Sequence, residues 1–232
     1  MIYENIVKGK FISRPNRFIA RVLVDGNEEI VHVKNTGRCK ELLTGGALVY
    51  LQKSDKVERK TKYDLITVLK NGTNLVNMDS QVPNDVVEEF LKKGILFPKH
   101  AKIKREMRHG DSRFDFFIEC EGKISYMEVK GVTLEENGVA SFPDAPTERG
   151  VKHLLHLCEL AKGGIDAYIF FVIQMKGCYK LIPNRKTHKE FADALIKCRE
   201  YGVKILCYDC IITENSIEID KSIPVDLSDI GD

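Results

Sequence analysis

The segment SRFDFFIECEGKISYMEVK, residues 112–130, decides the fold of the second half of the chain. Its aromatic and β-branched residues predict two consecutive strands, and the segment Glu121-Gly122-Lys123 between them predicts a hairpin turn. Two adjacent antiparallel strands would bring the carboxylates of Asp115 and Glu128 close together. The segment therefore predicts a pair of acidic side chains at one place in a sheet.

Side-chain alternation adds a third functional group to this pair. Glu128 and Lys130 share one face of the second strand, while Val129 points into the opposite layer and presents its carbonyl at the same edge. Carboxylate and carbonyl oxygens are the ligands that Mg²⁺ prefers. We therefore predict Asp115, Glu128 and the Val129 carbonyl as ligands of Mg²⁺, with Mn²⁺ as an alternative ion. Lys130 would position or help deprotonate a water molecule, which predicts metal-dependent cleavage of a phosphodiester.

The Glu-x-Lys pattern alone is weak support, because charged pairs are common on solvated strand faces. Its position on the second of two paired strands, with Asp115 upstream, favours the catalytic interpretation.

Composition indicates a globular protein. The chain has 232 residues, of which 43% are hydrophobic and 7 are prolines, which is enough for one large domain or two modest ones. No apolar run approaches the roughly 20 residues that span a bilayer, and the first residues lack the layout of a signal peptide. We therefore expect a cytoplasmic protein that does not insert into a membrane.

The seven cysteines are an odd number scattered along the chain, which favours free thiols over a disulfide framework. Cys207 and Cys210 have the spacing of a zinc or redox pair, but the chain has no second such pair and the segment around them predicts a strand. We expect these two cysteines to be structural.

The net charge of +2 is unevenly distributed. Residues 1–80 carry 14 Lys and Arg against 9 Asp and Glu, whereas residues 213–232 carry 1 against 6. A basic front half is compatible with a polyanionic partner such as nucleic acid. The acidic end, residues 223–232, predicts a loosely held tail.

Residues 1–80 predict a small β-barrel. Glycine-punctuated β-rich runs cover Ile6 to Ile12, Phe18 to Val24, Ile30 to Lys34, Ala47 to Lys53, Leu65 to Lys70 and Leu75 to Met78. Strands this short in about 80 residues favour an OB-like barrel, with an SH3-like barrel as the alternative.

Residues 81–232 predict an α/β domain, so that the chain as a whole is α+β. A helix capped by Asn84 or Asp85 and ended by Gly94 precedes three strands, at 101–107, 113–120 and 123–130. A helix at 145–162, a buried strand at 167–174, a helix at 187–201 and a strand at 203–212 follow. This order predicts a mixed sheet with helices on its faces.

The order helix, three-strand meander, helix, strand is similar to the core of the PD-(D/E)xK restriction-endonuclease-like superfamily. The whole chain resembles the sugar fermentation stimulation protein family. The segments that carry this resemblance are Arg14-Pro15-Asn16-Arg17-Phe18, Asn35-Thr36-Gly37, Pro83-Asn84 with Glu89, Arg105-Glu106, Ser112 to Asp115, Glu128 to Lys130 with Val132-Thr133-Leu134, Phe142 to Ala145, and Thr147 to Gly150 with Lys152-His153-Leu154.

The family resemblance implies an OB-like domain followed by a nuclease-like domain, sequence-nonspecific DNA binding and a regulatory role in sugar (maltose) metabolism. The superfamily resemblance adds Glu89, on the first helix, as a catalytic residue that holds a metal-bound water, in preference to its neighbour Glu88. Gln174 would either orient water or cap its strand.

Basic and aromatic residues in both halves are candidates for nucleic-acid contacts. Residues placed to contact phosphates or bases are Arg14, Arg17, Phe18, Lys34 and Arg38 in the front domain and Arg113, Arg149, Lys152 and His153 near the carboxylates. His153 would also suit a proton shuttle. For each residue the alternative is a solvent-facing side chain, or a core position for an aromatic ring.

DNA is the expected partner, RNA remains an alternative, and the sequence does not indicate the oligomeric state. A rival interpretation is a DNA-binding regulator whose nuclease fold is catalytically idle.

Overall fold

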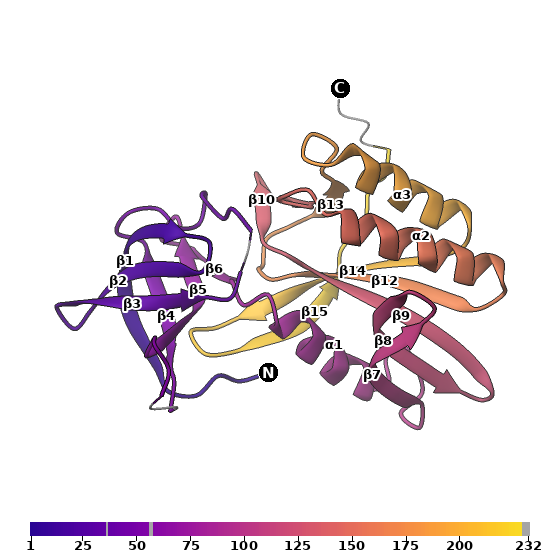
Figure 1. Cartoon of the computed structure of the whole chain (residues 1–232), viewed down its shortest axis with the longest axis horizontal. Coiled ribbons are helices and arrows are strands. Elements are labelled where there is room, and N and C mark those ends of the chain that lie inside the picture. Colours follow the sequence, from indigo (N-terminus) through magenta and orange to yellow (C-terminus); the bar gives the residue numbers. More distant parts are fainter. Residues whose placement is uncertain (36, 56–57, 229–232) are drawn as a thin grey trace.

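The computed structural model describes residues 1–35, 37–55 and 58–228, which form a barrel and a larger α/β domain (Figure 1). Thr36 of the loop motif and residues 229–232 of the expected tail lie outside the described ranges. No helix in these ranges is long and apolar enough to cross a membrane.

The first six strands form the barrel. They are β1 (Ile6–Asn16), β2 (Ile19–Val24), β3 (Asn27–Val33), β4 (Leu48–Lys53), β5 (Tyr63–Lys70) and β6 (Asn74–Asn77). The sheet order is β3-β2-β1-β4-β5-β6, and a parallel pairing of β3 with β5 closes the first five strands into a barrel. This closed OB-like barrel confirms the prediction. A tight turn with positive φ at Asn71 and Gly72 joins β5 to β6.

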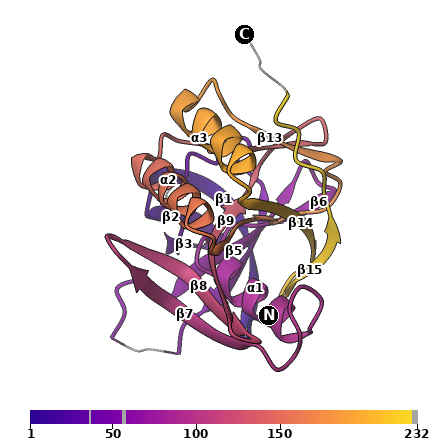
Figure 2. The same cartoon turned by 90° about the vertical axis from the view of Figure 1, so that its right-hand side faces the viewer.

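The larger domain contains three helices and nine strands among the described residues. In chain order they are α1 (Val82–Lys92), β7 (Lys102–His109), β8 (Ser112–Cys120), β9 (Lys123–Val132), β10 (Leu134–Glu136), β11 (Val139–Phe142), α2 (Glu148–Lys162), β12 (Asp166–Ile173), β13 (Lys180–Pro183), α3 (Lys189–Glu200), β14 (Lys204–Ile212) and β15 (Ile217–Ser222). The central sheet has the order β15-β14-β12-β9-β8-β7, with α2 and α3 on one face and α1 on the other (Figures 1 and 2).

The strand β12 forms the centre of this sheet. It runs parallel to both β9 and β14 and is buried on both faces, as its continuous apolar sequence predicts. Ile169 and Phe171 belong to a core that continues into the barrel interior, whereas Phe170 and Val172 pack with the residues of α1. The two apolar layers fix β9, the strand of Glu128, between them.

Short strands were missed by the sequence prediction. Strands β10, β11 and β13 form a separate three-stranded sheet, and β15 adds an edge to the central sheet. The first three have only three or four residues, which is too short for a two-residue periodicity to be recognised.

The expectation of a loosely held C-terminal tail is wrong for residues 223–228. The amide of Ile223 donates to the Cys207 carbonyl, and the amide of Leu181 donates to the Pro224 carbonyl, each at 2.9 Å. The side chain of Leu227 is buried. These contacts tie the segment to β13 and β14 despite its acidic composition.

The start of α1 also differs from the prediction. The helix begins at Val82 after Gln81, and no side chain caps it. Pro83 stands in the first turn, where a missing N–H costs nothing, so Asn84 already lies inside the helix. The side chain of Asn84 is thereby available for a tertiary contact.

The first residues of the chain pack against the larger domain. Ile2 forms a bridge with Ser216, and the Tyr3 amide donates to the Asn215 carbonyl at 2.8 Å. The expected front domain of residues 1–80 therefore contributes its N-terminal end to the other domain.

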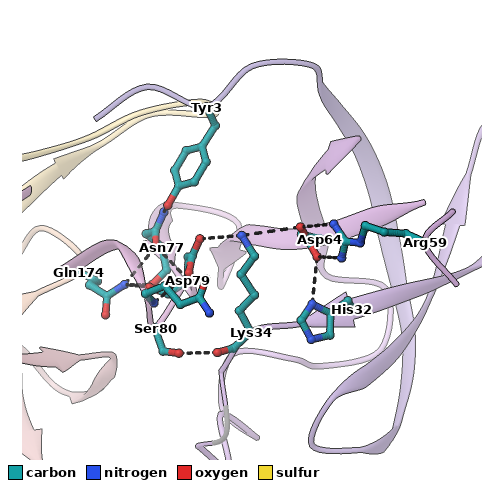
Figure 3. Close-up of polar contacts among 10 residues, drawn as sticks. Tyr3, His32, Lys34, Arg59, Asp64, Asn77, Asp79, Ser80 and Gln174 are labelled. Atoms are coloured by element: carbon teal, nitrogen blue, oxygen red, sulfur yellow. Dashed lines mark hydrogen bonds and ion pairs between the residues drawn. The ribbon is translucent and has the colours of Figure 1, made fainter. Parts of the chain in front are cut away.

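A polar network joins the two domains (Figure 3). The Nε2 atom of Gln174, at the end of β12, donates to the carbonyls of Asn77 and Asp79 and to Oδ1 of Asn77. The Nδ2 atom of Asn77 donates to the Tyr3 hydroxyl at 3.2 Å. Gln174 thus holds the connection between β6 and α1, which differs from both roles predicted for it.

The network continues into the barrel through Lys34 and Asp64 (Figure 3). The ammonium of Lys34 lies 3.2 Å from Asp79 and 3.6 Å from Asp64. Asp64 also accepts two hydrogen bonds from Arg59, at 2.6 and 2.9 Å, and lies 3.0 Å from Nδ1 of His32. Burial favours the neutral acid, but the bonds from Arg59 and His32 hold the pKa of Asp64 below its ordinary value.

We predict that Asp64→Asn lowers the free energy of unfolding by about 2–4 kcal/mol, because it removes a buried carboxylate from three partly buried basic groups. The contribution of Asp64 is present above its unfolded pKa, about 3.9, and is lost as pH falls through the lower folded value. Urea unfolding of both proteins between neutral and acid pH checks this. Glu28→Gln, at an exposed pair with Arg21, serves as the control. A stability difference that does not shrink at acid pH would contradict the assignment.

Candidate metal centre and nucleic-acid surface

The carboxylates of Asp115 and Glu128 lie at the point where β8 and β9 separate. Their ladder runs from the Cys120–Lys123 pair to the Phe116–Met127 pair, and the same register continued by one residue places Asp115 opposite Glu128. The two-residue turn Glu121-Gly122 has positive φ at both residues, as the predicted hairpin requires. The predicted pairing is therefore present.

Asp115 is held by two elements. Its Oδ2 accepts a hydrogen bond from the Val129 amide at 2.7 Å, and its Oδ1 accepts one from Nδ2 of Asn84, on α1, at 2.9 Å. Each oxygen keeps a further lone pair for another ligand. Asn84 is a site residue that the sequence prediction missed, because it was assigned as a helix cap.

Glu128 is 3% exposed and is held by two nitrogen groups. Its Oε1 lies 2.5 Å from the Lys130 ammonium and 2.5 Å from Nδ1 of His153, on α2. Its other oxygen, Oε2, is buried without a hydrogen-bond partner in the described part of the chain. A buried carboxylate oxygen of this kind calls for a bound water or ion.

The two carboxylates have opposite pKa shifts. Burial and the nearby charge of Glu128 raise the pKa of Asp115, against the effect of its hydrogen bonds from Val129 and Asn84. Burial also opposes ionisation of Glu128, but the hydrogen bonds and charges of His153 and Lys130 lower its pKa overall. A cation between the two carboxylates would favour the charged form of both.

His153 connects Glu128 to the protein surface. Its Nε2 accepts a hydrogen bond from Nε of Arg149 at 3.4 Å, while its Nδ1 faces Glu128. Because a carboxylate oxygen only accepts hydrogen bonds, Nδ1 is the ring nitrogen that donates to Glu128. His153 is buried and acts on Glu128. It does not face a phosphate at the surface, which is the role that the sequence had suggested.

Glu89 does not join the site. It follows Asn84 by five residues, which is about 140° around the helix, so the two side chains leave α1 on different sides. The carboxylate of Glu89 lies 2.6 Å from the amino group of Met1 and is about half exposed. Glu88 pairs with Lys92 and Arg105. The structure therefore does not bring Glu89 to the two carboxylates.

Two of the predicted nucleic-acid residues hold the barrel together instead. The guanidinium of Arg14 donates to four carbonyls, those of Arg17, Asn35, Gly37 and Arg38, at 2.6 to 2.9 Å. Lys34 is used by Asp64 and Asp79 in the interdomain network. In both cases the positive group is directed to the protein and not to solvent.

The other basic candidates of the barrel surround an open groove. Arg17, Arg38 and Lys40 line this groove, which has a volume of 320 Å³, and their side chains are exposed. Phe18 is 48% exposed, and the Arg17 guanidinium lies 5.3 Å from the centre of its ring. Phe11, in contrast, is a core residue. The groove is therefore lined by cations, one of which, Arg17, also contacts the exposed ring of Phe18.

The candidates of the larger domain lie on its surface. Arg149 and Lys152 are exposed on the first turns of α2, and Arg113 is exposed on β8 with Glu106 at 3.6 Å. Arg149 and Lys152 are thereby on the helix that carries His153. Arg113 lies two residues before Asp115.

The barrel loop that ends the groove also reaches the strand of Lys130. Asn35 and Ser80 line a polar cavity of 80 Å³ together with Gly131, the residue after Lys130, and with Asp144. A side chain at Gly37 would place its Cβ 2.0 Å from Oδ2 of Asp144, which explains why glycine occupies this position. The loop that contributes Gly37 to the groove therefore lies close to the strand of Glu128 and Lys130.

The cysteine pair is not a metal site in its own right. Cys207 packs in the core below α2 and α3, whereas Cys210 belongs to the layer of α1, on the other face of β14. All seven cysteines are free thiols.

Comparison with family models covers nearly the whole chain. Residues 12–78 match the SfsA N-terminal OB domain, and residues 81–216 match the sugar fermentation stimulation protein RE domain. A sugar fermentation stimulation protein homolog from Ruminiclostridium cellulolyticum is 55% identical over 227 residues, which are 98% of this chain and 100% of the relative. A homolog from Clostridium beijerinckii is 57% identical over 219 residues, 94% of this chain and 96% of the relative.

A solved structure is similar as well. It is described as "The structure of Pyrococcus Furiosus SfsA in complex with Ca2+", and it has a TM-score of 0.88 and 29% identity, covering 97% of this chain and 98% of the other. The family resemblance recognised in the sequence is confirmed by these matches. The chain belongs to the sugar fermentation stimulation protein family.

Proposed function

We propose that this protein is a divalent-cation-dependent phosphodiesterase that binds DNA without strong sequence preference. The observation that carries the proposal is the buried, unpartnered Oε2 of Glu128 in the described structure, beside the carboxylate of Asp115. The description of a family member in complex with Ca²⁺ supports a cation-binding role for the fold.

The residues present fit a hard cation. Asp115 and Glu128 offer carboxylate oxygens, and the predicted third ligand is the carbonyl of Val129, a set that suits Mg²⁺, Mn²⁺ or Ca²⁺. When bound, such a cation neutralises charge on a phosphate and makes a bound water more acidic.

Neighbouring side chains hold the two carboxylates of this site in fixed orientations. Asn84 fixes the carboxylate of Asp115, and His153 fixes Oε1 of Glu128, so that Oε2 keeps one orientation. The side chain of Lys130 is 17% exposed, so its ammonium is accessible from solvent as well as bound to Glu128. It would orient an attacking water and stabilise negative charge that develops on the phosphate.

The barrel groove supplies the means to hold the substrate. Arg17, Arg38 and Lys40 would contact phosphates, and Phe18 would stack on a base or sugar, which are interactions without sequence preference. The polar cavity between Asn35 and Gly131 places this groove beside the strand of Lys130. A strand held in the groove would therefore continue towards the carboxylates.

One observation favours the rival function, a DNA-binding regulator with an idle site. Lys130 and His153 both contact Oε1 of Glu128, so this carboxylate is already charge-compensated by protein groups. Such a cluster is stable without a cation, and the DNA-binding groove does not depend on it.

The first test is cation binding and cleavage. We expect Asp115→Asn to weaken Mg²⁺ or Ca²⁺ binding in calorimetry by at least about 100-fold and to abolish cleavage of labelled DNA and RNA with Mg²⁺ or Mn²⁺. Asn84→Ala, which removes only a positioning contact, should weaken cation binding by about 10- to 100-fold.

Glu89→Gln is the matched control, because its carboxylate pairs with Met1 and should change neither quantity. Cleavage that survives in Asp115→Asn would exclude this site. DNA binding without cleavage by the wild type, with any of these cations, would instead support the idle-site regulator.

The second test separates nucleic-acid contacts from structural ones. The double variant Arg17→Ala/Arg38→Ala should weaken DNA binding and reduce the slope of log affinity against log salt by about 2, because two phosphate contacts are lost. Fluorescence anisotropy at several salt concentrations measures this slope.

Arg14→Ala should behave differently, lowering the free energy of unfolding by about 2–4 kcal/mol because four backbone carbonyls lose a charged donor. The double variant should unfold within about 0.5 kcal/mol of the wild type. An unchanged salt slope in the double variant would remove the groove from the proposal.

A further inference from the structure

A second group of metal-ligating side chains lies at the far end of the β8–β9 hairpin. His100 precedes β7, Cys120 ends β8, and Glu121 begins the turn to β9. One donor atom from each residue lies within 4.8 Å of the other two. Cys120 follows Asp115 by five residues on β8, about 17 Å along the strand, so this group is separate from the Asp115–Glu128 site.

Strand register brings the three residues together. Lys102 pairs with Glu119, and the same antiparallel register continued by two residues places His100 opposite Glu121. Cys120 pairs with Lys123 across the two-residue turn, and positive φ values at Glu121 and Gly122 fix the backbone of that turn. The backbone therefore holds all three donors at one corner of the sheet.

Two of the three donor distances are within about 0.4 Å of those around a shared metal ion. Nε2 of His100 lies 3.7 Å from Sγ of Cys120 and 3.7 Å from Oε1 of Glu121. Zinc bonds of about 2.0 Å to nitrogen or oxygen and 2.3 Å to sulfur, at tetrahedral angles, separate nitrogen from sulfur by about 3.6 Å and nitrogen from oxygen by about 3.3 Å. Without an ion, the ring of His100 is within hydrogen-bond distance of Cys120 and forms an ion pair with Glu121 when it is protonated, so the three side chains already converge.

The types of donor atom indicate which metal ion this group of residues would bind. Imidazole nitrogen and thiolate sulfur suit Zn²⁺ and similar transition metals, whereas Mg²⁺ and Ca²⁺ prefer oxygen ligands. His100 and Glu121 are exposed and Cys120 is partly exposed, so the group is open to solvent on one side. Three protein ligands with an open fourth position distinguish such a group from structural zinc sites, which have four protein ligands.

We propose that His100, Cys120 and Glu121 form a binding site for Zn²⁺, with a fourth coordination position open to solvent or to an external ligand. On binding, the thiol of Cys120 releases its proton to the solvent and the thiolate sulfur coordinates the ion. The bound ion links the segment before β7 to the β8–β9 turn. This site is independent of the proposed phosphodiesterase activity.

The test uses the reduced, full-length protein, freed of metal with a chelator and titrated with Co²⁺ as a spectroscopic probe. We expect a thiolate-to-cobalt charge-transfer band in the near ultraviolet that stoichiometric Zn²⁺ removes and excess Mg²⁺ does not. Cys120→Ser should abolish the band. His100→Gln and Glu121→Gln should each weaken Zn²⁺ binding by at least about tenfold, the smallest loss typical of even an outer-shell partner.

Two variants serve as controls. Glu119→Gln changes the neighbouring carboxylate, which lies 3.5 Å from the Lys102 ammonium, and should leave the band unchanged. Asp115→Asn removes a ligand of the other site and should also leave it unchanged, so failure of one proposal does not affect the other. No band with the wild type, or a band that survives in Cys120→Ser, would overturn the zinc site.

Thiol labelling gives a second readout. Six of the seven cysteines are buried, and Cys120 alone is partly exposed. A thiol reagent should therefore modify one thiol in the native chain, and Zn²⁺ but not Mg²⁺ should protect it. Labelling at equal rates with and without Zn²⁺ would overturn the assignment.

Discussion

The buried carboxylate of Glu128 is the constraint around which the larger domain is organised. Strand β9 lies between parallel β12 and antiparallel β8, with helices on both faces, so a charge on it is removed from water. Lys130 from the same strand and His153 from α2 compensate this charge at one oxygen. The packing of α2 on the sheet is therefore tied to the state of Glu128, and the second oxygen of this carboxylate has no hydrogen-bond partner among the described residues.

The connection between the two domains also contains buried polar groups that need hydrogen-bond partners. Residues between β6 and α1 leave the barrel and enter the larger domain through a buried region, where each polar group needs a partner. Gln174 satisfies the carbonyls of Asn77 and Asp79, and Lys34 links Asp79 to Asp64 in the barrel. Because this network and a continuous apolar core span both domains, the barrel groove keeps a fixed place beside the strand of Lys130.

The two candidate metal groups use the same hairpin in different ways. At one end of β8 the oxygen donors are buried and held by hydrogen bonds from other elements, which suits a hard cation and charged substrate. At the other end His100, Cys120 and Glu121 are held only by strand register and a tight turn, and they remain open to solvent. Donor chemistry thus distinguishes the two groups more clearly than their position does.

Local sequence determined the strands of residues 112–130, the hairpin turn at Glu121-Gly122, the barrel and the pairing of Asp115 with Glu128, because two-residue periodicity and turn residues act over short distances. Pro83 was a local signal for the start of α1 that would have placed Asn84 inside the helix. Tertiary structure decided which basic side chains are used by the protein itself: the guanidinium of Arg14 binds backbone carbonyls, whereas the side chain of Arg38 is exposed. It also turned Glu89 towards Met1 and brought His153 to Glu128. These side-chain contacts form between residues that are distant in the chain, so no local sequence pattern predicts them.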